Sequence, residues 1–212
     1  MMNSVKNIIL DVDGTLWNTT EVVAIAWSRA IQANGNSKVT VDGARLRTLF
    51  GKPMDVIGKE LFIDVSGKER EELLESCCQY EQKALHEEKG ELLYPHVSET
   101  IQQLALKQQR KLFIVSNCQS GYIELFLQKN NLASYITDFE CFGNTGLDKG
   151  KNIALLMERN KISAPECVYV GDTAGDCEAA KEAGVPFIFA AYGFGNATGT
   201  EQIQDFAELL TK

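Results

Sequence analysis

Two aspartates, Asp11 and Asp13, follow the apolar run 8–10 and stand directly before Gly14. Alternate residues of a strand face the same side, and glycine lets the chain turn sharply. The two carboxylates are thus delivered into one small space, where like charges raise each other's pKa or recruit a cation. The pattern indicates acid–base or metal chemistry, although a strand followed by an ordinary Asp-Gly turn has the same sequence.

Polar side chains also follow two later apolar runs. One run ends at Ser116 and Asn117, and the other ends at Asp172, with Asp176 four residues further on. In open α/β sheets, ligands bind at the carboxyl ends of the strands. Carboxylates gathered there repel one another, and oxygen-rich sites suit Mg²⁺, which also binds phosphate oxygens. The sequence therefore predicts a site for Mg²⁺ and a phosphoryl group at this edge.

Ser116 and Asn117 offer hydroxyl and backbone N–H donors to phosphoryl oxygens. A helix expected to open near Gln119 would point its free N–H groups the same way. Both residue types are equally common as helix caps, so the sequence does not separate the two roles. The segment from Thr173 to Asp176 likewise matches a capping box, which is an alternative to a role for Asp176 at a metal.

Lys149 precedes a helical pattern that carries Ile153, Leu156 and Met157. A cation near a helix N-terminus interacts unfavourably with the positive end of the helix dipole. A lysine at this position is therefore expected to face an anion. That anion would be the transferring phosphoryl group, whose charge must be neutralised. The alternatives are an exposed lysine, the usual fate of lysines, and Lys151 in the same role.

Apolar strand patterns alternate with amphipathic helical patterns along the chain. This alternation predicts an α/β fold, a Rossmann-like doubly wound parallel sheet of about five strands with helices on both faces. A helix is predicted over Glu21–Ala33, another from a capping box at Ser66, and a closing helix over Glu201–Leu210. The expected strands are 5–11, 111–116, 136–142, 166–171 and 186–191.

Residues 17–94 interrupt this alternation, because they show helical patterns with few strand signals. A single crossover needs far fewer residues. We therefore expect residues 17–94 to form an inserted all-helical cap, and residues 1–16 and 95–212 to form the core. An insertion directly after Asp13 sits over the strand ends, where a lid is useful.

Length, net charge and composition exclude several classes of protein. The 212 residues suit one domain with an insertion or two small domains. The net charge of −8 without a basic stripe argues against a nucleic-acid partner. Since no apolar run reaches the length of a membrane span and no signal peptide is seen, we expect no membrane partner and a cytoplasmic location. The six cysteines lack a Cys-x-x-Cys pair and are expected to be reduced thiols. A monomer or a small homo-oligomer is expected.

The motifs occur in the order Asp-x-Asp-Gly-Thr, Ser-Asn, Lys and Gly-Asp-x-x-x-Asp. This order resembles the haloacid dehalogenase-like phosphohydrolase superfamily over residues 5–191, and the insertion resembles its phosphoglycolate phosphatase-like branch, which has a helical (C1-type) cap. The resemblance implies a Mg²⁺-dependent phosphatase that hydrolyses a small phosphorylated metabolite through an aspartyl-phosphate. Dehalogenases of the superfamily lack the second aspartate, so Asp13 disfavours dehalogenation.

The resemblance also implies a role for each residue of the site. Asp11 is the nucleophile, and Asp13 is the general acid and base that protonates the leaving oxygen and then activates water. Lys149 neutralises the phosphoryl group. The remaining assignments are phosphate binding by Ser116, Asn117 and Gly14; metal binding by Asp11, Asp172 and the backbone carbonyl of Asp13; and support by Asp176 as a further ligand, through a water or through Lys149.

Two other functions stay open. A phosphomutase of the β-phosphoglucomutase type shares the core residues and a helical cap, but returns the phosphoryl group to a sugar. A non-catalytic binding or regulatory protein is disfavoured, because binding alone does not require Asp13. The chain also departs from the family pattern, since the Lys-Pro-x-Pro form is absent at Lys149. Cys118 and Gln119 stand where phosphoglycolate phosphatases often have a lysine, which argues against phosphoglycolate as the substrate.

Overall fold

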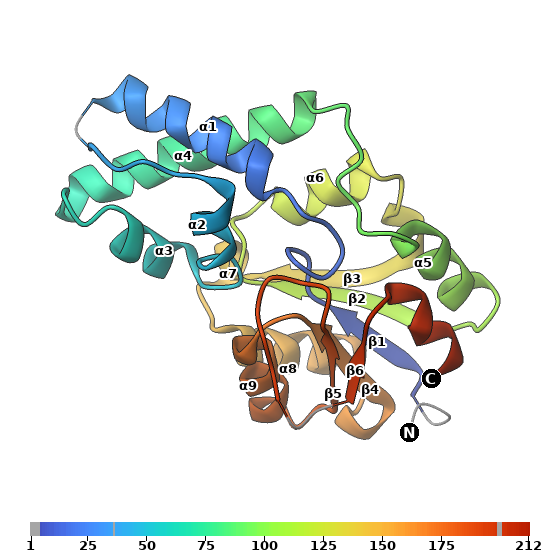
Figure 1. Cartoon of the computed structure of the whole chain (residues 1–212). Coiled ribbons are helices and arrows are strands. Elements are labelled where there is room, and N and C mark those ends of the chain that lie inside the picture. The colour runs from blue at the N-terminus through green and yellow to red at the C-terminus, as the bar shows by residue number, and fades with distance from the viewer. Residues whose placement is uncertain (1–4, 36, 199–200) are drawn as a thin grey trace.

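The computed structural model describes residues 5–35, 37–198 and 201–212, and the parts of the predicted core and cap that fall on residues 1–4, 36 and 199–200 lie outside it. A sheet is flanked by helices, and a second group of helices gathers beyond one end of the sheet (Figure 1). The elements are β1 (Asn7–Leu10), α1 (Thr20–Asn34), α2 (Gly43–Arg47), α3 (Met54–Leu61), α4 (Gly67–Glu87), α5 (Val97–Leu106), β2 (Lys111–Ser116), α6 (Tyr122–Lys129), η2 (Ala133–Tyr135), β3 (Ile136–Cys141), α7 (Phe142–Thr145), α8 (Lys149–Asn160), η3 (Ala164–Glu166), β4 (Cys167–Gly171), α9 (Ala174–Glu182), β5 (Phe187–Ala190), β6 (Glu201–Ile203) and η4 (Phe206–Thr211), where η marks a 3₁₀ helix.

The sheet is parallel throughout, with the strand order β3-β2-β1-β4-β5-β6. β1 lies between β2 and β4, and Leu10 is in register with both Ile114 and Val170. The residues that follow these three strands therefore emerge at the same edge, where ligands bind in open α/β sheets. The predicted α/β, doubly wound parallel fold is confirmed.

Side chains alternate between two buried clusters along each central strand, as a period of two requires. Ile8 and Leu10 point into the cluster under α5, α6 and η4. Ile9 and Phe113 point into the cluster under α8 and α9. Both faces of β1 are thus covered, which holds the end of this strand, and the residues after it, in a fixed position.

The C-terminal segment differs from the prediction of a helix over Glu201–Leu210. Residues Glu201–Ile203 form β6 instead, a sixth strand of the described sheet that pairs in parallel with β5. Only Phe206–Thr211 are helical, as the 3₁₀ helix η4, which Asp205 caps through the backbone N–H of Ala207. A three-residue strand is too short to show a periodicity, and its pairing with β5 is a tertiary contact that local sequence does not encode.

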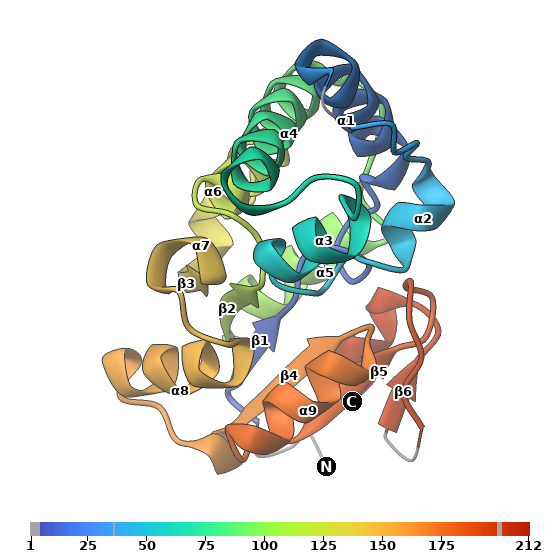
Figure 2. The same ribbon diagram turned by 90° about the vertical axis from the view of Figure 1, so that its left-hand side faces the viewer.

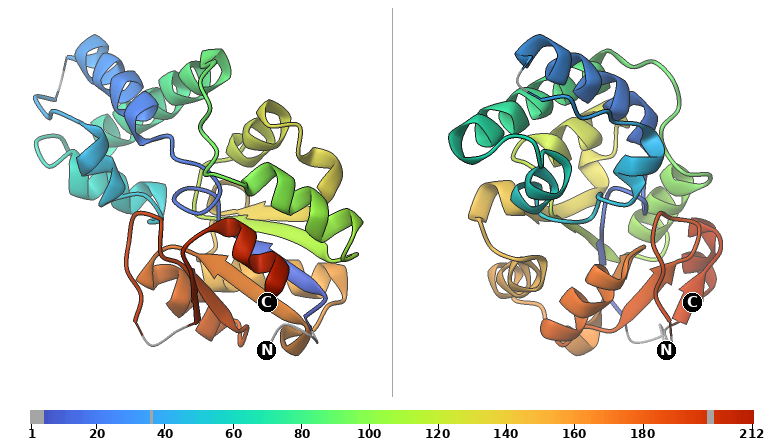
Figure 3. Two further views of the ribbon diagram at one scale, coloured as in Figure 1. Left: turned by 45° about the vertical axis from the view of Figure 1, so that its right-hand side comes forward. Right: turned by 60° about the vertical axis from the view of Figure 1, so that its left-hand side comes forward.

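Helices α1–α4 lie together over the carboxyl ends of the strands, and we call them the cap helices (Figure 2). α1 and α4 lie side by side, and in both views of Figure 3 the cap helices are at the opposite end of the molecule from the C-terminus. α4 begins at Gly67 as predicted, but Ser66 makes no side-chain capping bond. The two connections to the core run alongside each other: Asn18 N donates to Leu92 O at 2.8 Å, and Tyr94 N donates to Leu16 O at 3.0 Å.

Two expectations from composition can be compared with the described residues. Each of the six cysteines carries a free thiol. Within the parts of the chain that the structure describes, none of the helices has the length and apolar character needed to cross a bilayer.

Candidate active site

The sheet brings three of the predicted acidic positions to one edge. Asp11 continues β1, and its N–H donates to Val170 O at 2.9 Å. Asp172 follows β4, and Asp176 lies in the first turn of α9. All three side chains are buried in the described structure. Ligand oxygens of these three carboxylates lie within 4.8 Å of one another.

Lys149 supplies a positive charge to this cluster. It is the first residue of α8, and its Nζ donates to Asp11 Oδ1 at 3.0 Å and to Asp176 Oδ1 at 2.6 Å. Burial alone would lower the pKa of Lys149, but the two carboxylates outweigh it and raise the pKa above its ordinary value. Lys151 is exposed and bonds to Asp148 at 3.1 Å. The geometry thus selects Lys149 over Lys151 as the lysine at the carboxylates.

The three carboxylates of this cluster carry more negative charge than Lys149 can neutralise. Burial raises the pKa of Asp11 to about 6, although Lys149 opposes the shift. Burial, with the charges of Asp176 and Asp11, raises the pKa of Asp172 well above its usual range. Asp11 Oδ2 is buried and has no hydrogen-bond partner among the described residues. An all-oxygen donor set with an unpartnered carboxylate oxygen fits a hard divalent cation such as Mg²⁺.

Asp176 also forms the capping box that the segment from Thr173 to Asp176 predicts. Thr173 N donates to Asp176 Oδ2 at 2.9 Å, and Asp176 N donates to Thr173 Oγ1 at 3.1 Å, which completes a capping box at the start of α9. The other carboxylate oxygen bonds Lys149. One side chain therefore caps α9 and positions the lysine, so the two interpretations do not compete.

Gly14 is required by the closeness of Asp172. Its φ is +82°, and a Cβ at this position would lie 2.1 Å from Asp172 Oδ2. A loop after β5 approaches the same carboxylate, since Phe194 N donates to Asp172 Oδ2 at 2.7 Å. This contact could not be predicted, because every residue type except proline can donate a backbone N–H from a loop. A role for Gly14 in phosphate binding stays a prediction.

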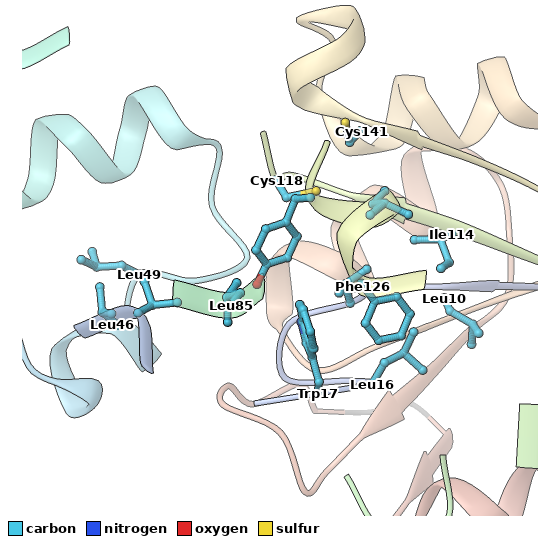
Figure 4. Close-up of a cluster of buried hydrophobic side chains, with 14 of the residues drawn as sticks. Leu10, Leu16, Trp17, Leu46, Leu49, Leu85, Ile114, Cys118, Phe126 and Cys141 are labelled. Carbon is cyan, nitrogen blue, oxygen red and sulfur yellow. The ribbon is translucent and has the colours of Figure 1, made fainter. Parts of the chain in front are cut away.

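The Asp13 carboxylate lies among aromatic and hydroxyl side chains rather than in the cluster of Asp11, Asp172 and Asp176. Trp17 Nε1, Thr19 Oγ1 and Tyr122 Oη all donate to its Oδ1, at 3.1, 3.2 and 2.7 Å. Burial raises the pKa of Asp13 to about 7, even though these bonds favour the carboxylate. Trp17 packs edge-on against Tyr122 at a centroid distance of 5.5 Å, which holds both donors in place. It also packs edge-on against Phe126, at 4.9 Å (Figure 4). Helical spacing explains Tyr122 as a buried residue of α6, and nothing in the sequence indicates the bond from its hydroxyl to Asp13.

A small cavity separates the cap helices from the strand ends. It offers about 20 Å³ to a water-sized sphere, room for little more than one water molecule. The core residues Asp13, Ser116 and Asn117 line it from one side. The rest of its lining is Trp27, Phe50, Gly51, Lys52, Met54, Ile57, Glu81, Cys118, Gln119 and Tyr122.

Ser116 and Asn117 do not cap a helix. α6 begins at Tyr122 after Gly121, so the expectation of a helix opening near Gln119 is wrong. Asn117 Nδ2 instead donates to Gly51 O in the cap at 2.8 Å, while its Oδ1 is buried without a partner among the described residues. Gly121 adopts a φ of +84°, a left-handed conformation that glycine permits and that delays the helix.

Lys149→Met is expected to lower the free energy of unfolding of the metal-free protein by about 3 kcal/mol, the usual cost of removing one partner of a buried ion pair. Denaturant titration at neutral pH measures this. Lys151→Met is the matched control, because Lys151 is exposed on the same helix turn, and a change below about 0.5 kcal/mol is expected for it. Equal losses for the two variants would contradict a buried role for Lys149.

Comparison with known proteins agrees with this geometry. A sequence profile of the haloacid dehalogenase-like hydrolases matches residues 8–190. The chain belongs to this family. Family membership accounts for the order of the motifs and for the strand ends at which they lie.

Relatives and solved structures of the family extend the match over nearly the whole chain. Phosphoglycolate phosphatases of Vibrio parahaemolyticus and Vibrio vulnificus are 30% and 32% identical to it, each over 91% of this chain and 86% of the relative. The fold is similar to that of a haloacid dehalogenase-like family hydrolase from Streptococcus pneumoniae, with a TM-score of 0.84, 18% identity and 99% of both chains covered. A structure titled a predicted phosphoglycolate phosphatase from Haemophilus somnus also has a TM-score of 0.84, at 21% identity over 100% of this chain and 99% of that one.

Proposed function

We propose that this family member is a Mg²⁺-dependent phosphatase that hydrolyses a small phosphomonoester through an aspartyl-phosphate. The observation that carries the proposal is the buried Oδ2 of Asp11, which has no partner in the part of the chain that the structure describes and lies in a carboxylate cluster beside a buried lysine. Its environment suits a nucleophile facing a cation-bound phosphoryl group. The relatives named as phosphoglycolate phosphatases support the reaction class.

Asp11 and Asp172 are the proposed side-chain ligands of Mg²⁺, with the backbone carbonyl of Asp13 as a third. Their burial and mutual closeness support the assignment, because a cation relieves their repulsion. When bound, Mg²⁺ neutralises charge on the phosphoryl oxygens and on the carboxylates. Asp176 acts through Lys149, which it bonds at 2.6 Å.

The reaction consists of two displacements at phosphorus. Asp11 Oδ2 forms a bond to phosphorus while the ester P–O bond breaks, and Asp13 gives its proton to the leaving oxygen. Asp13, now a carboxylate, then takes a proton from a water molecule, which attacks phosphorus and releases phosphate and free Asp11. A pKa of about 7 allows Asp13 to serve as acid and then as base near neutral pH. Ser116 and Asn117 are proposed to hold the phosphoryl oxygens.

Residues 17–94 are proposed to move as a cap on a core of residues 1–16 and 95–212. The adjacent connections at Asn18–Leu92 and Leu16–Tyr94 support a two-stranded hinge. The cavity of about 20 Å³ is smaller than a phosphate ester, which supports an outward swing of the cap helices to admit the substrate. Asn117 bonds the cap at Gly51 and must release it on opening.

Removal of metal tests the proposal directly. Phosphate release from p-nitrophenyl phosphate is expected with Mg²⁺ and is expected to stop when excess EDTA is added, then return with fresh Mg²⁺. The melting temperature should rise with Mg²⁺ concentration, because the ion binds only the folded protein. A mutase would instead need a bisphosphate activator and release little phosphate. Turnover that is indifferent to EDTA would contradict the proposed cofactor.

A further inference from the structure

Glu81 is a buried carboxyl that the proposed reaction does not use. It belongs to cap helix α4 and is 3% exposed. It lines the same cavity as Asp13. Burial raises the pKa of Glu81 to about 7. Burying an ionisable carboxyl costs free energy. An uncharged acceptor such as an amide could accept the same hydrogen bonds, so the carboxyl points to a role beyond structure.

The partners of Glu81 are neutral donors. Trp27 Nε1 donates to Oε2 at 2.7 Å from within the cap, and Gln119 Nε2 donates to Oε1 at 3.1 Å from the core. Among the described residues, no basic side chain forms an ion pair with it. A carboxylate accepts about four hydrogen bonds, so these two leave capacity for further donors. The bond from Gln119 joins α4 to the segment after β2, so the cap opening proposed above would break it.

Three basic side chains of the cap bond to groups other than Glu81. Lys52 is the one basic side chain in the described lining of the cavity, and both its bonds, at 2.8 and 2.7 Å, go to the carboxylate of Glu60. Arg47 pairs with Glu21 at 3.3 Å, and Arg45 donates to Glu60 O at 3.2 Å. Residues 17–94 therefore supply to this lining one acid, Glu81, together with Lys52 and with apolar side chains such as Phe50 and Ile57.

We infer that Glu81 selects the leaving group of the substrate: a phosphomonoester of an alcohol that carries a further hydrogen-bond donor, a hydroxyl or an ammonium, and no second anion. This rests on the proposed phosphatase function and names its substrate class. With the phosphoryl oxygens held by Ser116 and Asn117, as proposed above, the alcohol would extend into the cavity that Glu81 also lines. Its donor takes the place of the Gln119 amide or joins it. A second carboxylate or phosphate at this position would face the Glu81 carboxyl, and Lys52, the one basic side chain in the described lining, already bonds Glu60.

The test compares substrates of similar size on the full-length protein with Mg²⁺. These are glycerol phosphate and ethanolamine phosphate, which carry donors, n-propyl phosphate, which carries none, and phosphoglycolate, which carries an anion. For the wild type, kcat/KM is expected to be at least about tenfold higher for the better donor-bearing ester than for the other two, the scale of one hydrogen bond to a charged group. Whether the hydroxyl or the ammonium ester is the better one identifies the donor.

Glu81→Gln is expected to lower the ratio of kcat/KM between the donor ester and phosphoglycolate at least about tenfold, mainly through KM, because it removes the negative charge and keeps the shape. Glu71→Gln, an exposed position on the same helix, is the matched control and should leave the ratio unchanged. A ratio equal in wild type and Glu81→Gln overturns the inference. So does a wild type that hydrolyses phosphoglycolate at least as efficiently as both donor esters, a result that needs no variant to fold.

The outcomes separate this inference from the proposed function. If p-nitrophenyl phosphate and all four esters release no phosphate, both are overturned. If p-nitrophenyl phosphate is hydrolysed in a Mg²⁺-dependent way while the donor esters show no preference, the phosphatase stands and the role of Glu81 is overturned. Circular dichroism of Glu81→Gln confirms that any change in the ratio comes from a folded protein.

Discussion

Asp11→Asn is expected to lower kcat for p-nitrophenyl phosphate at least about a hundredfold and to abolish covalent labelling of the protein by substrate. An amide is a poor nucleophile, and the side chain loses one of the charges proposed to hold Mg²⁺. The label is measured by mass spectrometry after acid quenching, as a phosphoryl adduct on the peptide that contains residue 11. Steady-state kinetics at saturating Mg²⁺ measures kcat.

The fold of this variant is expected to survive, which makes the loss interpretable. Burial and the neighbouring charge of Asp176 raise the pKa of Asp11, so the ionised Asp11 side chain destabilises the metal-free protein. The melting temperature of metal-free Asp11→Asn should therefore not fall much below that of the wild type. Asp55→Asn, exposed in the cap, is the control and should keep full activity. Undiminished turnover or persistent labelling by Asp11→Asn would contradict the covalent mechanism.

Much of the core was predictable because its signals are local. Apolar runs that end in polar residues mark the strands, and five of them lie within about two residues of where the structure places them. The chain positions of Asp11, Ser116 and Asp172 at strand ends follow from the same runs. Parallel pairing then brings the strand ends to one edge without any further information, as the register of Leu10 with Ile114 and Val170 shows.

The contacts that tune the site were not predictable because they join segments far apart in sequence. Tyr122 and Asp13 are 109 positions apart, and helical spacing accounts fully for a buried tyrosine without its hydroxyl bond. Phe194 reaches Asp172 through a backbone N–H, which any residue type supplies. Glu81 looks in sequence like one more acid of a charged helix, and only the packing of α4 on the core shows that it is buried. The roles of the site residues themselves stay predictions.

Asp13→Asn is expected to give a different failure from Asp11→Asn, although kcat should again fall at least about a hundredfold. p-Nitrophenolate leaves without protonation, so the first displacement needs no acid and Asp11 is still phosphorylated. The second displacement lacks its base, so the phosphoenzyme accumulates. A burst of nitrophenolate equal to the enzyme concentration, followed by a slow phase, should be seen in rapid mixing. If Asp13→Asn shows neither burst nor label, Asp13 is not the base of the second step.

The pH dependence of the wild type follows from the same carboxyl. For an alkyl ester Asp13 must be protonated, and because its pKa is raised to about 7, the protonated fraction and the rate should fall about tenfold per unit of pH above that value. Tyr122 donates to the carboxylate and so favours the charged form; Tyr122→Phe should raise the pKa of Asp13 and move the alkaline limb of the profile to higher pH. Tyr80→Phe, at an exposed position on α4, should leave the profile where it is. A shift to lower pH in Tyr122→Phe would show that Asp13 is not the acid that sets this limb, because losing a donor to a carboxylate can only favour its protonated form.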